Sequence, residues 1–190
     1  MINIVIFGKP GAGKGTQAEF LKEKYNLTHL STGDIFRYNI KNETDLGKLA
    51  KTFMDKGDLV PDEVTIKMLE SEVDKNQDSA GFLFDGFPRT LTQANALDEF
   101  LVSKNQAITA TIALDANDEI LVQRLLARGK TSGRPDDQDE EKIRNRYQEY
   151  NEKTSPLMNY YKAQNKFYSV DGIGSVSEVT ERISSVIAKL

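Results

Sequence analysis

Hydrophobic and polar positions divide the chain into short apolar runs and longer segments in which apolar residues recur every three or four positions. The short runs are NIVIFG, THL, GFLFDG, AITATIAL and KFYSVD, and each predicts a strand. The longer segments follow these runs and predict helices. Because strands alternate with helices, we expect one α/β domain over residues 1–190, with five parallel strands and helices on both faces.

The helix boundaries are marked by capping signals. Thr90 with Gln93, and Ser175 with Glu178, have the spacing of capping boxes. Helices are predicted at 34–42, 45–56, 62–75, after Thr90, after Asn117, at about 140–165, and after Ser175.

Three features interrupt the helices of the second half. Gly129 predicts the end of the helix that starts after Asn117, since glycine favours the position just past a helix. The stretch KTSGRPDDQ that follows is the most loop-like part of the chain. Pro156 is expected to break or bend the long helix at 140–165.

The stretch GKPGAGKGT, at 8–16, nearly matches the phosphate-binding pattern G-x-x-x-x-G-K-[ST]. Gly15 takes the place of the hydroxyl residue after Lys14, and the hydroxyl comes one position later, at Thr16. Glycines let the backbone turn tightly, so that N–H groups at the start of the next helix point at an anion. A strand before the loop and a helix after it favour phosphate binding over a simple turn.

A carboxylate and several arginines could serve the same phosphates. Asp85 ends the run GFLFD, where it either holds Mg²⁺ or merely caps a turn; beside a phosphate loop, the magnesium reading is favoured. The arginines that qualify are Arg37, Arg89, Arg124, Arg128, Arg134, Arg144 and Arg146. Arginines most often lie on a solvated helix face. Guanidinium groups that converge on one loop, however, would stabilise charge on a phosphoryl group.

Composition narrows the function class. The net charge is −4 and the isoelectric point about 5.2, which argues against a general nucleic-acid binder. No apolar run reaches the ~18–20 residues of a membrane span. The chain start has no basic segment typical of a secretory signal, and there is no cysteine. We therefore expect a cytoplasmic protein without membrane or nucleic-acid partners.

Four ordered stretches closely resemble the adenylate kinases, a branch of the nucleoside monophosphate kinase family. They are GKPGAGKGTQA, STGDIFR, GFLFDGFPRTLTQA and GRPDDQDEEKIRNRYQEY. The resemblance implies a P-loop NTPase-type fold with a helical AMP-binding segment at 31–60 and a short lid at 127–138. It implies a monomer that reversibly transfers a phosphoryl group from ATP to AMP with Mg²⁺, giving two ADP. In this family GKGT is the normal form of the loop.

The resemblance also implies a role for each matching position. ATP would be bound by Gly11, Ala12, Gly13, Lys14, Gly15, Thr16, Arg128 and Gly174. AMP would be bound by Thr32, Arg37, Asp58, Leu59, Val60, Gly86, Phe87, Pro88, Arg89, Gln93, Arg134 and Arg146. The catalytic set would be Lys14, Arg89, Arg124, Arg128, Arg134 and Arg146, and Asp85 would hold Mg²⁺ through water. Arg146 is preferred to Arg144.

Other functions are weighed against this one. A UMP/CMP kinase shares the loop and arginines but commonly has alanine and asparagine where Thr32 and Gln93 stand. A GTPase-like switch would need the guanine-reading pattern N-K-x-D, which the chain lacks. A binding protein without turnover would not need so many arginines. The short lid and the lack of cysteine predict no structural zinc. His29, the only histidine, is interpreted as structural.

Overall fold

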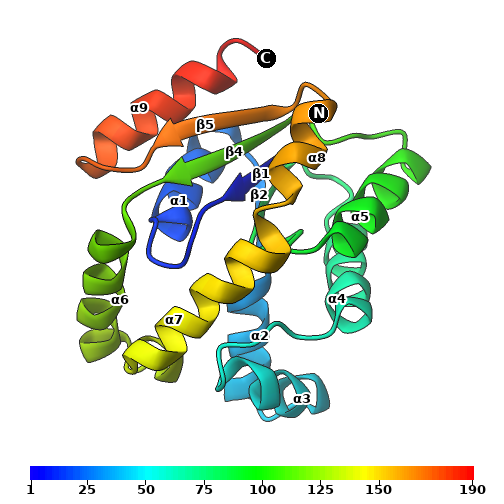
Figure 1. Cartoon of the computed structure of the whole chain (residues 1–190). Helices are drawn as coiled ribbons and strands as arrows, with labels where there is room; N and C mark the ends of the chain where they lie inside the picture. The colour runs from blue at the N-terminus through cyan, green and yellow to red at the C-terminus, as the bar shows by residue number, and fades with distance from the viewer.

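The computed structural model describes all residues, 1–190 (Figure 1). Five parallel strands form one sheet in the order β2-β3-β1-β4-β5. The strands are β1 (Ile4–Phe7), β2 (Thr28–Ser31), β3 (Phe82–Asp85), β4 (Ala110–Asp115) and β5 (Phe167–Asp171). The predicted five-stranded parallel sheet is confirmed, and the order brings the ends of β1 and β3 side by side.

Helices connect the strands. They are α1 (Lys14–Tyr25), α2 (Thr32–Lys41), α3 (Asp45–Met54), α4 (Asp62–Lys75), α5 (Leu91–Ser103), α6 (Asp118–Ser132), α7 (Glu140–Glu149), α8 (Leu157–Ala163) and α9 (Val176–Ile187). None of them is both long enough and apolar enough to cross a membrane.

Both faces of the sheet are buried, because successive side chains of a strand point to opposite faces. Ile4 and Ile6 of β1 pack with residues of α1, α6 and α9 on one face. Val5 and Phe7 pack with residues of α4, α5 and α8 on the other. This accounts for the continuous apolar runs at the strand positions, which are typical of parallel sheets.

A third, smaller core lies apart from the sheet. Phe36, Ala50, Val60 and Met68 pack together and join α2 and α3 to the start of α4. Figure 1 shows α2, α3 and the junction of α6 with α7 at one end of the molecule, away from both chain termini. The segment at 31–60 therefore has its own packing and lies beside the turn after α6.

The predicted end of α6 at Gly129 is wrong, and the helix continues to Ser132. The left-handed residue that ends it is Gly133, with φ of 65°. Gly129 is needed for a different reason: a Cβ on it would lie 2.6 Å from the carbonyl oxygen of Asp137. Part of the stretch expected to be a loop is therefore helical, and a short 3-10 turn, Pro135–Asp137, follows it.

The long helical pattern at 140–165 is divided, as Pro156 predicted. The division begins earlier than the proline, with a π-helical turn at Tyr150–Thr154 between α7 and α8. Proline has no N–H and its ring clashes with the carbonyl four residues before it, so regular α-helix cannot continue through this segment.

Of the two predicted capping boxes, only the one at Ser175 and Glu178 is complete. At α5 the Thr90 side chain accepts from the Gln93 N–H, but the Gln93 side chain does not return to Thr90. It accepts instead from the backbone N–H of Arg89 at 2.7 Å. The capping-box prediction is therefore half wrong at this helix, and the amide of Gln93 serves another purpose.

Candidate functional site

The glycine loop joins β1 to α1 and turns into the first turn of that helix. Gly13 has φ of 90°, a left-handed conformation, and a Cβ built on it would meet no atom within 4 Å. At Gly11, which has φ of 89°, a Cβ would lie 2.9 Å from the carbonyl oxygen of Leu121. Glycine is thus required for conformation at both positions and for packing at Gly11 alone, and the N-terminus of α1 is left facing open space.

That open space is a cleft of about 760 Å³, here called the main cleft. A second hollow, the side pocket, lies between α2, the start of α4 and the start of α5. The main cleft is lined by the loop, by the segment at 172–179, and by Arg124, Arg128 and Arg134. Its volume falls in the range of small-molecule sites, and its polar lining suits a charged ligand.

A third hollow shares lining residues with both. It is lined by Lys14, Arg37, Arg89 and Arg146, and these four cations also line the main cleft. Arg89 lines the side pocket as well. Positive charge is therefore concentrated where the main cleft meets the third hollow, beside the side pocket.

Lys14 is the first residue of α1, and its ammonium group turns back over the loop. It donates to the carbonyl oxygen of Gly8 at 2.7 Å. Burial, together with the nearby charges of Arg89 and Arg146, lowers the pKa of Lys14 from 10.5 to about 8, against the opposing effect of Asp85. This crowding of cations is an arrangement that phosphate oxygens would relieve.

Asp85 ends β3 beside the loop, as its strand position predicted. It is 8% exposed, and a Cβ on Gly15 would lie 3.8 Å from its Oδ2. Burial alone would raise its pKa, but His29 and Lys14 more than offset burial and hold the pKa below its usual value. The group is thus an ionised carboxylate that lines the main cleft.

His29 lies beside the Asp85 carboxylate, a neighbour that the sequence did not predict. Its Nε2 lies 3.5 Å from Asp85 Oδ2, longer than a normal hydrogen bond, and its Nδ1 lies 3.4 Å from Glu19 Oε1. Burial lowers the pKa of His29, but the two carboxylates outweigh burial and raise it. The His29 ring thus lies beside the same Asp85 oxygen, Oδ2, that is near Gly15 of the loop.

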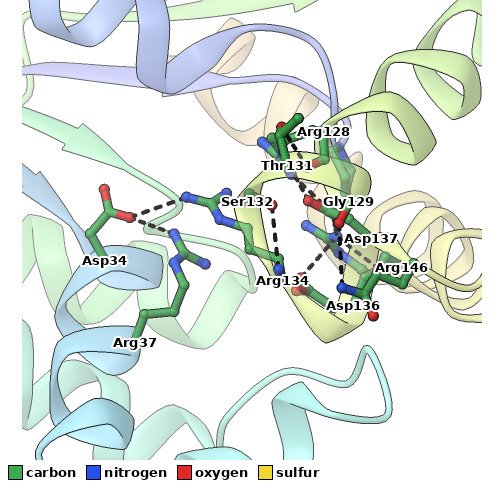
Figure 2. A network of polar contacts seen from close by, with 12 residues as sticks. Asp34, Arg37, Arg128, Gly129, Thr131, Ser132, Arg134, Asp136, Asp137 and Arg146 are labelled. Atoms are coloured by element: carbon green, nitrogen blue, oxygen red, sulfur yellow. Dashed lines mark hydrogen bonds and ion pairs between the residues drawn. The ribbon is translucent and has the colours of Figure 1, made fainter.

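Arg128 of α6 and Arg146 of α7 are held by carboxylates that the sequence analysis did not single out. Asp137, fully buried, accepts from Arg128 Nε at 2.6 Å and from Arg146 Nη1 at 2.8 Å. Asp136 also pairs with Arg146, at 2.9 Å. Figure 2 shows Asp137 between the two guanidinium groups. Asp137 therefore fixes two predicted phosphate ligands at once.

A further acid, Asp34 of α2, connects that helix to the turn after α6. Asp34 Oδ1 accepts from Arg37 Nη2 at 2.6 Å and lies 3.7 Å from Arg134 Nη2 (Figure 2). Arg37 and Arg134 come from opposite sides of the main cleft, from α2 and from the residue after Gly133. Asp34 thus brings together two cations that the resemblance assigned to AMP binding.

Arg144 and Arg146 lie on the same helix but face different surroundings. Arg144 pairs with Glu140, and its side chain is 60% exposed. The Arg146 side chain is 17% exposed and lines the main cleft. The geometry supports the choice of Arg146. Arg124 also lines the main cleft and makes no ion pair.

The side pocket gathers the positions expected to read a base. It is lined by Thr32, Gly33, Phe36, Met54, Asp58, Leu59, Val60, Thr65, Gly86, Arg89 and Gln93. Thr32 donates to the Gly86 carbonyl at 2.9 Å, and Arg89 Nε donates to the same oxygen at 2.8 Å. Burial and Arg146 lower the pKa of Arg89 to about 10, so its guanidinium stays charged at neutral pH.

Most of the predicted site residues line these three spaces. Pro88 lines the third hollow, while Gly11, Ala12, Gly13, Gly15, Thr16 and Gly174 line the main cleft. Phe87 is an exception: it is 1% exposed and belongs to the core under α5, so it supports the site from behind.

Comparison with known proteins gives one consistent result. A family model described as adenylate kinase matches residues 6–166. The chain belongs to the adenylate kinase family. Proteins named adenylate kinase from Flavobacterium psychrophilum and Flavobacterium johnsoniae are 82% and 74% identical to it over 190 residues, the whole of both chains. One of the same name from Bacteroides fragilis is 48% identical, also over the full length of both.

Membership of the adenylate kinase family confirms the predicted resemblance and fold class. The UMP/CMP kinase alternative is not favoured, because these relatives all carry the name adenylate kinase. The structure has no group of three or more histidine, aspartate or glutamate side chains placed to hold a metal ion. Asp85 places a carboxylate in the lining of the main cleft, and carboxylate, phosphate and water oxygens are the ligands that Mg²⁺ prefers.

The adenylate kinase site contains functional groups that sequence reasoning did not identify. Asp34, Asp62 and Asp137 each accept hydrogen bonds from residues that line the cavities. For Asp34 and Asp137, the only sequence signal was an acidic residue close to a predicted arginine, as in GDIFR and GRPDD. No such signal exists for Asp62, whose partner Gln93 is 31 positions away.

Proposed function

We propose that the chain catalyses the reversible transfer of the terminal phosphoryl group of ATP to AMP, giving two ADP. One nucleotide would occupy the main cleft and the other the side pocket. Family membership supports the reaction class, and the cations shared by the main cleft and the third hollow support phosphoryl transfer at that place. Relatives of this chain named adenylate kinase support the choice of adenine nucleotides.

The donor would bind mainly through backbone groups. The glycine loop and the N-terminus of α1 would hold the ATP phosphates, with Lys14 on the terminal ones. Arg128 and the backbone at Gly174 would lie against the base. The segment at 31–60 would then hold the acceptor, and the segment at 127–138 would act as the lid.

The acceptor would bind mainly through side chains. Arg37 and Arg89 would grip the AMP phosphate, and guanidinium forks suit the paired oxygens of a phosphate. Thr32 and Gln93 would read the base, with the backbone at 58–60 beside it. Pro88 and Gly86 would form the turn that carries Arg89.

The chemical step needs no general base, because an AMP phosphate oxygen is already a competent nucleophile. Catalysis would come from alignment of the two phosphates and from cations around the phosphoryl group in transfer. Arg124, Arg134 and Arg146 would surround it together with Lys14 and Arg89. Closure of the lid would keep water from taking the phosphoryl group.

Mg²⁺ bound with ATP would neutralise phosphate charge, and Asp85 would orient its water ligands. The Asp85 carboxylate suits this role because it is ionised, nearly buried and beside the loop. His29 would keep that carboxylate in place.

The single observation that carries the proposal is that Lys14, Arg89 and Arg146 line both the main cleft and the third hollow, and that Arg89 also lines the side pocket. The test measures phosphoryl transfer from Mg-ATP to AMP, UMP, CMP and GMP in parallel, with a no-acceptor control for hydrolysis. Strong preference for AMP with little hydrolysis is expected. Preference for UMP or CMP would overturn the base assignment, and hydrolysis without transfer would overturn the role of the cations.

A further inference from the structure

The side-chain amide of Gln93 is held from two sides. Gln93 is the third residue of α5, is 2% exposed, and lines the side pocket. Its Oε1 accepts from the backbone N–H of Arg89 at 2.7 Å. Its Nε2 donates to Asp62 Oδ1 at 2.8 Å, and Asp62 Oδ2 accepts from the Thr90 hydroxyl at 2.9 Å.

These two partners allow one orientation of the amide. A backbone N–H can only donate, and an ionised carboxylate can only accept. If the amide turned over, its NH₂ would face the N–H of Arg89 and its oxygen would face Asp62. Two buried hydrogen bonds would be lost, each of which is costly when its groups are left unpaired. The orientation is therefore locked.

A locked amide still has one donor and one acceptor to offer. An amide oxygen accepts two hydrogen bonds and an NH₂ donates two, and the protein uses one of each. Adenine presents an amino donor next to the N1 acceptor. Hypoxanthine, the base of inosine monophosphate, presents a carbonyl acceptor next to an N1–H donor. The order of donor and acceptor is reversed between these two bases, so only one of them matches a fixed amide.

We propose that Asp62 is a positioning residue that sets base selection at the acceptor site by fixing the orientation of the Gln93 amide. Asp62 does not line the side pocket, so it would act on a bound base only through Gln93. This inference rests on the proposed function, in which Gln93 reads the acceptor base. It adds a reason why the glutamine accepts adenine and rejects a 6-oxopurine.

The test compares kcat/KM for AMP with kcat/KM for inosine monophosphate in four proteins: the unchanged chain, Asp62→Leu, Asp62→Asn and Gln93→Ala. Leucine is close in shape to aspartate but accepts no hydrogen bond. Asparagine keeps an acceptor for Gln93 and can donate to the Thr90 hydroxyl. We expect Asp62→Leu to lower the AMP preference at least about tenfold, and Asp62→Asn to retain most of it.

The ratio separates a positioning role from a role in folding. A merely structural aspartate would lower kcat/KM for both acceptors by the same factor and leave their ratio unchanged. That result for Asp62→Leu, together with a collapsed ratio in Gln93→Ala, would overturn the role of Asp62 and leave the proposed function intact. An unchanged ratio in Gln93→Ala would show instead that the base is read elsewhere.

Two further outcomes bear on the mechanism. A loss in Asp62→Asn as large as in Asp62→Leu would overturn the hydrogen-bond account, because the acceptor geometry is kept in the asparagine variant. If Asp62→Leu does not fold, as checked by circular dichroism, Asp62→Ala takes its place with the same expected ratio.

Discussion

The two sides of the site are built on different principles. On the loop side, the groups that would meet phosphates are mostly backbone N–H groups at the N-terminus of α1, and glycine supplies the conformation. On the side of α2 and α5, the groups are side chains, and other side chains or carbonyls hold them. Gly86 accepts from Thr32 and Arg89, and Asp62 accepts from Gln93.

This difference teaches where selectivity resides. A backbone loop recognises phosphate, which is common to all nucleotides, and changes to most side chains do not alter it. A pocket of buried side chains can distinguish one base from another, because each unmatched polar group is costly. We therefore expect donor binding to be tolerant and acceptor binding to be strict. Changes to the cations between the two sides should affect the use of both the donor and the acceptor.

The largest effects should come from the cations on the border between the two sides. Arg89→Ala and Arg146→Ala should each lower kcat by about 10²–10³-fold, because each removes charge that acts on the phosphoryl group in the transition state. The measurement is steady-state transfer from Mg-ATP to AMP.

Arg144→Ala is the matched control for these variants. It removes an arginine from the same helix as Arg146, but one that is exposed and paired with Glu140. Its kcat should stay within about twofold of the unchanged chain, since exposed pairs contribute little. Normal turnover in Arg146→Ala with loss in Arg144→Ala would reverse the assignment.

A smaller effect is expected at Asp137, which organises the cations without meeting substrate. Asp137→Asn should lower kcat about tenfold and the free energy of unfolding by about 2 kcal/mol, because Arg128 and Arg146 lose a charged acceptor. Urea unfolding measures the second quantity. An unchanged kcat would mean that the two arginines need no anchor.

The pH dependence at Asp137 has a definite sign. Burial would raise its pKa, but Arg128 and Arg146 lower it below the ordinary 3.8. The carboxylate therefore contributes stability above that pH and loses it as the pH falls through the lower folded-state pKa. The difference in the free energy of unfolding between the unchanged chain and Asp137→Asn should therefore shrink as the pH falls.

The smallest effect is a pH dependence of ATP use that arises from Lys14 in the glycine loop, seen as a descending limb in the profile of kcat/KM against pH. Lys14 has a pKa of about 8 and would bind phosphate as the cation, so kcat/KM for ATP should fall as the pH rises through about 8. Lys14→Arg should remove this limb, because a guanidinium stays protonated there. A limb that persists unchanged in Lys14→Arg would assign it to another group.

A loss of folding stability at Lys14 cannot explain this fall in kcat/KM above a pH of about 8. The pKa of Lys14 is lowered from 10.5 to about 8 in the folded chain, so the unfolded chain binds more protons between these values. The contribution of Lys14 to stability therefore rises with pH over that window. Thermal unfolding followed across the same pH range checks the sign.

The loop side could be predicted from the sequence because its determinants are local. Gly13 and Lys14 act through the strand before them and the helix after them, and the sheet order then places Asp85 beside them. The pattern of apolar runs is equally local, since strand and helix periods are read over a few residues.

The other side could not be predicted to the same depth. The partner of Gln93 is chosen by how α4 and α5 pack, not by spacing, and the capping-box pattern pointed to a different bond. Gly129 misled for a related reason: its role is close packing against Asp137, which only the folded chain reveals. Which acid holds which arginine is likewise a property of tertiary structure.

The central claim is that one chain binds two nucleotides whose phosphates meet at Lys14, Arg89 and Arg146. The most direct test is a crystal structure of the chain with Mg-ADP, the common product. The account predicts two ADP molecules, one with its phosphates on the loop and one with its base at Gln93 and its phosphates at Arg37 and Arg89. A single ADP per chain, or a second one outside the side pocket, would contradict it.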